Sequence, residues 1–289
     1  MAVLEITNFT DPTCPFAFSA EPHRIRLRWL FGDQIAWRNR MVGLSERPED
    51  YLEKGLTSEK LAAALARLAR EHGMPMDTRE QPRMMATVIA CRAVIATRLY
   101  CPGREDALLR RLRILRFAGE LIDEPAVIAR AAREADVHPE ALERWMDEPA
   151  VEAALREDMA DARMPTAAAR ALDHKLSGPE DERRYTCPSL RFVRPADGRT
   201  VDVPGFQPFA AYEVVIANLC PNLERRPAPS SVEEVLVWAG EPLATAEVAA
   251  IMEVPHDDAR NELSRFAALE PVGTDGWWTL PAASARLAA

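Results

Sequence analysis

The chain lacks the features of a membrane protein, a secreted protein or a nucleic-acid-binding protein. No run approaches the roughly 20 apolar residues that a membrane-spanning helix needs. The formal net charge is −9, which does not favour attraction to nucleic acid or to anionic membranes. Residues 1–5 carry no basic segment followed by an apolar stretch, so we expect no secretory signal. These absences predict a cytoplasmic protein with no nucleic-acid or membrane partner.

Common catalytic motifs and metal-ligand spacings are also missing. The sequence contains no glycine-rich phosphate loop, no His-Glu-x-x-His pair and no Gly-x-Ser-x-Gly elbow. The five histidines show no ligand spacing, and five scattered cysteines do not make a disulfide framework. We therefore expect no bound metal and cysteines that are normally reduced.

One short segment, Thr10-Asp11-Pro12-Thr13-Cys14-Pro15-Phe16-Ala17, has the composition of a reactive site. It follows an apolar, strand-like run at 3–9 and precedes an amphipathic helix that we expect to reach residue 30. A cysteine in the first turn of a helix lies near unpaired backbone N–H groups, which favour the thiolate. The carboxylate of Asp11 would raise the pKa of Cys14 if it lay close, and the sequence leaves open which influence is larger.

The order of the predicted elements indicates an α/β fold with a large helical insertion. Strands at 3–9 and 35–44 flank the first helix, as in a right-handed crossover unit. From 45 to about 179 the apolar residues follow the helical period, with proline or glycine at most joins. An Asp197-Gly198 turn predicts a hairpin of strands 189–193 and 200–203, and a last helix follows at 209–219. The helices predicted in the insertion are 61–71, 83–100, 105–121, 125–135, 139–146 and 149–161.

A proline-rich linker at 225–231 separates these elements from a C-terminal module. Helices at 232–238, 245–252 and 257–269, followed by a hairpin at 270–280, resemble a winged helix. Its recognition helix would place two arginines against three acids, whereas phosphate contacts need an excess of basic residues. The pattern therefore favours a docking role or homodimer formation through this module over DNA binding.

The segment from Asp11 to Phe18, with its preceding strand and following helix, resembles the active-site opening of the DsbA-like branch of the thioredoxin superfamily. That branch uses Cys-Pro-x-Cys and a distant proline loop, which Thr186-Cys187-Pro188-Ser189 matches. Ala17 stands where the second cysteine would be. The resemblance covers about residues 2–221. It implies a thioredoxin-like domain at 1–45 and 185–222, an inserted helical domain at 46–184 and a C-terminal winged-helix-like module at 230–289.

The resemblance also implies roles for individual residues. Cys14 would be the nucleophile, and Pro188 would be cis and shape the groove. Cys187 would lie within contact range of Cys14, as a resolving thiol or second ligand, or would simply pack there. Because alanine cannot attack a mixed disulfide, another thiol must release the partner from Cys14. Substrate-binding positions would be Pro15, Phe16, Ala17, Phe18 and Thr186, with the two phenylalanines forming part of an apolar rim, while Cys91, Cys101 and Cys220 would be structural.

Three functions stay open from the sequence. The leading hypothesis is a thiol-disulfide oxidoreductase or thiol-exchange protein that acts on a protein or small-molecule thiol or disulfide. A second is a transferase or isomerase that binds a low-molecular-weight thiol as cofactor, as the similar kappa-class glutathione transferases and chromene-carboxylate isomerases do. A third is a non-catalytic adaptor that keeps only a binding groove.

Overall fold

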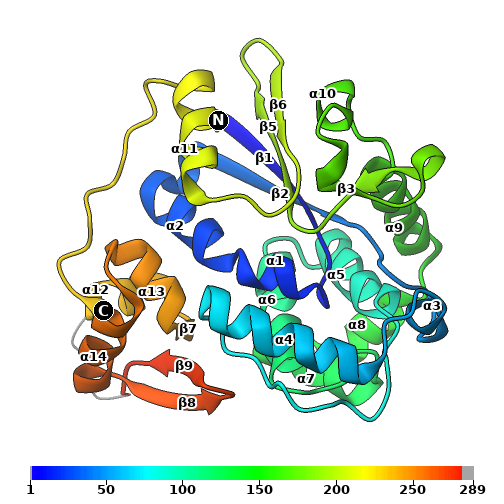
Figure 1. Ribbon diagram of the computed structural model, residues 1–289, viewed down its shortest axis with the longest axis horizontal. Coiled ribbons are helices and arrows are strands. Elements are labelled where there is room, and N and C mark those ends of the chain that lie inside the picture. The colour runs from blue at the N-terminus through cyan, green and yellow to red at the C-terminus, as the bar shows by residue number, and fades with distance from the viewer. Residues whose placement is uncertain (1, 282–289) are drawn as a thin grey trace.

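A four-stranded mixed sheet lies at the centre of the computed structural model, which describes residues 2–281 (Figure 1). The strand order is β2-β1-β5-β6. Strands β1 (Leu4–Thr10) and β2 (Ile35–Met41) are parallel, and β5 (Ser189–Arg194) and β6 (Arg199–Val203) continue the sheet as an antiparallel hairpin. This is the predicted order of strands, and α11 (Phe209–Leu219) follows it at the predicted bounds.

The helix after Cys14 is broken, contrary to the prediction of one helix reaching residue 30. It consists of α1 (Pro15–Ser19) and α2 (Glu21–Phe31), which meet at Ala20. Pro22 has no backbone N–H to donate to the carbonyl of Phe18, so the helical hydrogen-bond pattern is interrupted there. Cys14 therefore begins a helix of only five residues, and nearby N–H groups matter more for its sulfur than a long helix dipole.

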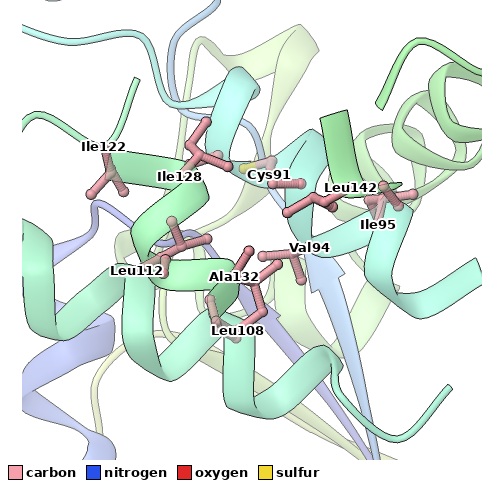
Figure 2. Close-up of a cluster of buried hydrophobic side chains, with 14 of the residues drawn as sticks. Cys91, Val94, Ile95, Leu108, Leu112, Ile122, Ile128, Ala132 and Leu142 are labelled. Carbon is pink, nitrogen blue, oxygen red and sulfur yellow. The ribbon is translucent and has the colours of Figure 1, made fainter. Parts of the chain in front are cut away.

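The inserted domain is a helical bundle with its own apolar core. Figure 2 shows this core, in which the side chain of Cys91 is fully buried among leucine, isoleucine and valine side chains. The described helices of this part are α3 (Glu49–Glu53), α4 (Ser58–His72), α5 (Val88–Tyr100), α6 (Glu105–Phe117), α7 (Pro125–Glu134), α8 (Pro139–Met146), α9 (Pro149–Ala162) and α10 (Ala167–Arg170).

Two helices of the insertion are shorter than predicted by more than one residue, and the short helices α3 and α10 and a small strand pair were missed. α5 begins at Val88 rather than 83, because the preceding residues bind elsewhere: the Arg83 guanidinium and the Ala86 N–H both contact the Asp123 carboxylate. α6 ends at Phe117 rather than 121, and Gly119 follows with a φ of +103°. β3 (Leu176–Ser177) pairs with β4 (Arg184–Tyr185), so the boundary predicted between 184 and 185 falls inside a strand.

The C-terminal module packs against the rest of the chain. α13 lies on α2, and Trp277 of β9 contacts Phe18 of α1. At the hairpin tip, Gly273 has a φ of +59° and passes so near the Met76 carbonyl oxygen that a Cβ would clash with it. The elements are α12 (Val232–Ala239), β7 (Leu243–Ala244), α13 (Thr245–Met252), α14 (His256–Phe266), β8 (Ala268–Val272) and β9 (Asp275–Thr279), with sheet order β7-β9-β8.

At this end of the chain, one helix is shorter than predicted and part of the predicted module lies outside the described residues. α14 stops at Phe266 rather than 269, since β8 begins at Ala268. Residues 282–289 of the predicted module lie outside the described residues. Within residues 2–281, no helix combines the length and apolar character required to cross a membrane.

Candidate active site

The structure brings Cys14 and Cys187 together, although they lie 173 positions apart in the sequence. Cys14 is the residue before α1, and its Sγ donates a hydrogen bond of 3.4 Å to the backbone carbonyl oxygen of Cys187. The peptide bond between Cys187 and Pro188 is cis, and Pro188 is buried. Cys14 is 6% exposed and Cys187 is 7% exposed. Both cysteines are free thiols, with Cys14 in the loop after β1 and Cys187 in the loop before β5.

The surroundings of Cys14 favour its thiolate. The hydrogen bond from the Cys187 thiol is the largest influence that lowers the pKa of Cys14. Burial and the Asp11 carboxylate raise this pKa, whereas the backbone N–H groups of Ala17 and Phe16 lower it, and the net direction is downward. Burial, together with the neighbouring Cys14, raises the pKa of Cys187 well above its ordinary range. Of the two thiols, Cys14 is therefore the one whose thiolate the surroundings favour, and the Cys187 thiol acts as the hydrogen-bond donor.

The buried carboxylate of Asp11 organises the loop that carries Cys14. One oxygen, Oδ1, accepts hydrogen bonds from the Thr13 N–H at 2.9 Å and the Thr13 hydroxyl at 2.8 Å. The other, Oδ2, accepts from the Leu44 N–H at 3.1 Å and lies 3.5 Å from the Cys91 sulfur. The side chain is fully buried. Asp11 thus ties the loop to the chain after β2 and to α5, and its negative charge opposes the thiolate of Cys14.

The remaining predicted site residues fall into two groups. Phe16 is 41% exposed and Pro15 is half-buried beside Cys14, so both are available to a partner. Phe18 is 1% exposed and stacks on Phe117 with ring centroids 4.3 Å apart. Its predicted place in an apolar rim is wrong, because its ring fills the core between α6 and the C-terminal module. The Thr186 hydroxyl donates to the Lys175 carbonyl oxygen at 2.8 Å and is not free for a substrate.

Two residues near the site were missed from the sequence. Tyr51 of α3 lies beside Thr13 and Ser45, and burial raises the pKa of its hydroxyl well above the ordinary range. Arg116 of α6 is 3% exposed and lies near Tyr51. No motif marks Tyr51. Arg110, Arg113 and Arg116 recur at every third position of a leucine-rich helix. This spacing is the feature of the sequence that could have identified Arg116.

No arrangement of side chains in residues 2–281 suggests a metal centre. No group of three or more histidine, cysteine, aspartate or glutamate residues within this range could hold an ion.

A cysteine that precedes a helix, faces a cis-proline loop and follows a central strand of a β2-β1-β5-β6 sheet defines a thioredoxin-fold protein with a helical insertion. The model of the DsbA-like thioredoxin domain family matches residues 5–165, more than half of the chain. The chain therefore belongs to this family.

Solved structures share the fold at low sequence identity. The probable DsbA oxidoreductase from Streptomyces coelicolor is 18% identical with a TM-score of 0.55, over 78% of this chain and 93% of that one. The cytosolic disulfide reductase DsbM from Pseudomonas aeruginosa is 17% identical with a TM-score of 0.52, over 75% and 100%. Its structure with GSH is also similar, at 16% identity and a TM-score of 0.50 over 74% and 99%. Among curated proteins, no match to this chain was found.

Replacing Cys187 by alanine is expected to raise the pKa of Cys14, because the largest influence that lowers it is lost. The pH midpoint of iodoacetamide alkylation at Cys14, followed by peptide mass, should move upward by about one pH unit. Cys187→Ser keeps a hydroxyl donor and should move the midpoint less. Cys220→Ala, which removes a remote thiol, is the control. An unchanged midpoint in Cys187→Ala would contradict the assignment of Cys187 as the donor.

Proposed function

We propose that this protein is a thiol-disulfide oxidoreductase that exchanges disulfides through one nucleophile, Cys14. The observation that carries the proposal is the Cys14 sulfur at the cis-proline loop, where contacts with Cys187 and two backbone N–H groups lower its pKa. A thiolate is the form of cysteine that attacks disulfides. The family match adds support, since the similar structures named above include a disulfide reductase.

The first step forms a mixed disulfide. The Cys14 thiolate attacks one sulfur of the substrate disulfide, a bond forms between them, and the substrate S–S bond breaks. The other half of the substrate leaves as a thiolate and takes a proton from water. The Cys187 thiol and the N–H groups of Phe16 and Ala17 hold the attacking sulfur in its charged form until the bond forms.

The second step needs a thiol from outside the chain. Ala17 cannot attack, and burial raises the pKa of Cys187 so far that it is a poor nucleophile. A low-molecular-weight thiol therefore attacks the substrate sulfur of the mixed disulfide. Its sulfur forms a new disulfide with that substrate half, and Cys14 leaves as the thiolate. Over one cycle the incoming thiol is oxidised and the first leaving half of the substrate is reduced.

We also propose that the activity lies in the cytoplasm. The mechanism needs a supply of reduced small thiols, and cytosolic pools provide one. The five cysteines are all free. The printed description of DsbM as a cytosolic disulfide reductase, with a structure that holds GSH, supports this placement.

The decisive experiment compares the wild type with Cys14→Ser. Reduction of bis(2-hydroxyethyl) disulfide by excess glutathione should be accelerated by the wild type and should fall to the uncatalysed rate in Cys14→Ser. Cys220→Ser serves as the control. Intact-mass analysis during turnover should show one adduct, mapped to Cys14. A Cys14–Cys187 disulfide formed during turnover would refute release by an external thiol. A wild type no faster than Cys14→Ser would refute catalysis and would favour the third hypothesis, a non-catalytic adaptor.

A further inference from the structure

Three buried arginines follow one another along α6, and they differ in their partners. Arg110, Arg113 and Arg116 are spaced three residues apart and are all at least nine-tenths buried. Arg110 forms a pair of 2.7 Å with Glu247, and Arg113 pairs with Glu21 and also donates to Thr10. Within residues 2–281, Arg116 takes part in no ion pair or side-chain hydrogen bond: its Nε is buried without a partner, and its guanidinium lies 5.5 Å from the centre of the Phe117 ring.

An unpaired guanidinium in the interior is costly. Removing a charge from water without a partner costs several kcal/mol, which is why buried charges are normally paired. Burial lowers the pKa of Arg116 to about 10, so the group still carries its charge at neutral pH. A buried charge that lacks a carboxylate partner is suited to an anion that comes from outside the chain.

The neighbours of Arg116 do not supply that anion. Asp123 influences Arg116, but its carboxylate is already bound by the Arg83 guanidinium at 2.6 and 2.8 Å and by the Ala86 N–H at 3.2 Å. The other influence is the hydroxyl of Tyr51, which is neutral. Tyr51 in turn lies beside Thr13, the residue before Cys14.

We propose that Arg116 and the Tyr51 hydroxyl form a subsite for the carboxylate of a small thiol or disulfide whose sulfur reacts at Cys14. This inference rests on the proposed exchange activity and adds the substrate class. A guanidinium binds a carboxylate through two parallel hydrogen bonds, which orients the bound molecule as well as attracting it. A neutral or cationic disulfide leaves Arg116 unpaired and therefore binds more weakly and reacts more slowly at Cys14. Since Arg116 is only 3% exposed, the site suits a small molecule rather than an acidic protein surface.

The subsite is needed because the chain as a whole repels such substrates. Its formal net charge of −9 disfavours the approach of an anionic thiol. The Asp11 carboxylate behind Cys14 adds to this repulsion at the reacting sulfur. A fixed positive group beside Tyr51, which itself lies near Thr13 and Cys14, offsets both effects.

A binding experiment tests the subsite without any reaction. The probe is S-methylglutathione, which has two carboxylates and a capped sulfur that cannot exchange. It should raise the midpoint of thermal unfolding of the wild type and of Arg111→Gln, a control on the same helix, but not that of Arg116→Gln. Equal stabilisation of Arg116→Gln by the probe would overturn the proposal.

Kinetic selectivity is the second measurement. The rate of mixed-disulfide formation at Cys14 is compared for 3,3′-dithiodipropionate, which is anionic, and bis(2-hydroxyethyl) disulfide, which is neutral. The anionic-to-neutral rate ratio should fall by about 10- to 100-fold in Arg116→Gln, the range expected when a hydrogen-bonded charge contact is lost. Arg111→Gln should keep the wild-type ratio. An unchanged ratio in Arg116→Gln would refute the subsite.

Stability separates a binding role from a structural one. Arg116→Gln removes an unpaired buried charge, so its unfolding midpoint without ligand should equal or exceed that of the wild type. A clear loss of stability would identify a structural arginine and overturn the proposal. If no disulfide reacts but S-methylglutathione still binds through Arg116, the exchange function fails and the subsite stands. If exchange proceeds without charge preference or probe binding, the subsite alone fails.

Discussion

Replacing Ala17 by cysteine is expected to shorten the lifetime of a mixed disulfide on Cys14 by at least about 100-fold, because a neighbouring thiol acts at a high effective concentration. Position 17 lies three residues after Cys14, and its backbone N–H already contacts the Cys14 sulfur. A thiol introduced there would attack the mixed disulfide, form an internal disulfide with Cys14 and release the bound thiol. The wild type, which has alanine at this position, must wait for an external thiol.

The measurement is the decay of a preformed adduct of glutathione on Cys14, followed by intact mass with no added thiol. In Ala17→Cys the adduct should disappear with loss of glutathione and formation of an internal disulfide. In the wild type it should persist. Ala20→Cys is the matched control. It adds a thiol six residues after Cys14, and only residues three or four positions apart lie on the same face of a helix. Equal lifetimes in the wild type and Ala17→Cys would show that release does not depend on position 17.

The parts of the fold that follow from local patterns were predictable. Strand β1 and helix α11 lie where the apolar periodicity places them, and the turn at Asp197 and Gly198 joins β5 to β6. The break at Ala20 was also accessible in principle, since Pro22 is visible in the sequence, but the apolar period continues across it. Such features depend on residues a few positions apart.

Contacts between distant segments were not accessible from the same patterns. Phe18 is apolar whether it lines a rim or fills a core, and its partners Phe117 and Trp277 belong to other domains. The proximity of Cys14 and Cys187 was predicted from the resemblance to a known family and not from the periodicity of apolar residues. Arg110 and Arg116 look alike in the sequence. Only the placement of acids from other segments distinguishes the paired arginine from the unpaired one.

The paired arginines link the active-site segment to the rest of the molecule. Arg113 connects α6 to Thr10, at the end of β1, and to Glu21, at the start of α2. Arg110 connects the same helix to Glu247 of the C-terminal module. The loop that carries Cys14 lies between Thr10 and Glu21, so its position depends on these buried ion pairs. Among them, Glu21 faces the largest number of arginines.

Replacing Glu21 by glutamine should lower the free energy of unfolding by about 3–5 kcal/mol, the cost of leaving buried charges without their partner. Glu21 pairs with Arg113, lies 3.4 Å from Arg24 and is 3.9 Å from Arg110. Burial is the largest single influence and raises the pKa of Glu21, but Arg113, Arg24 and Arg110 outweigh it and hold the pKa below its ordinary value. The neutral amide would leave the buried Arg113 without a carboxylate partner, whereas Arg24 keeps Asp106 and Arg110 keeps Glu247.

The same pKa gives the sign of the pH dependence. Because the pKa is lower in the folded state, Glu21 contributes its full stability above its unfolded value of about 4.3, and this contribution is lost as the pH falls through the folded value. Urea unfolding should therefore show a large difference between wild type and Glu21→Gln at pH 7 that narrows on acidification below about pH 4. Glu134→Gln, which breaks an exposed pair with Arg130, should change stability by less than about 1 kcal/mol. If Glu21→Gln matched Glu134→Gln at pH 7, the buried cluster could not be what positions the Cys14 segment.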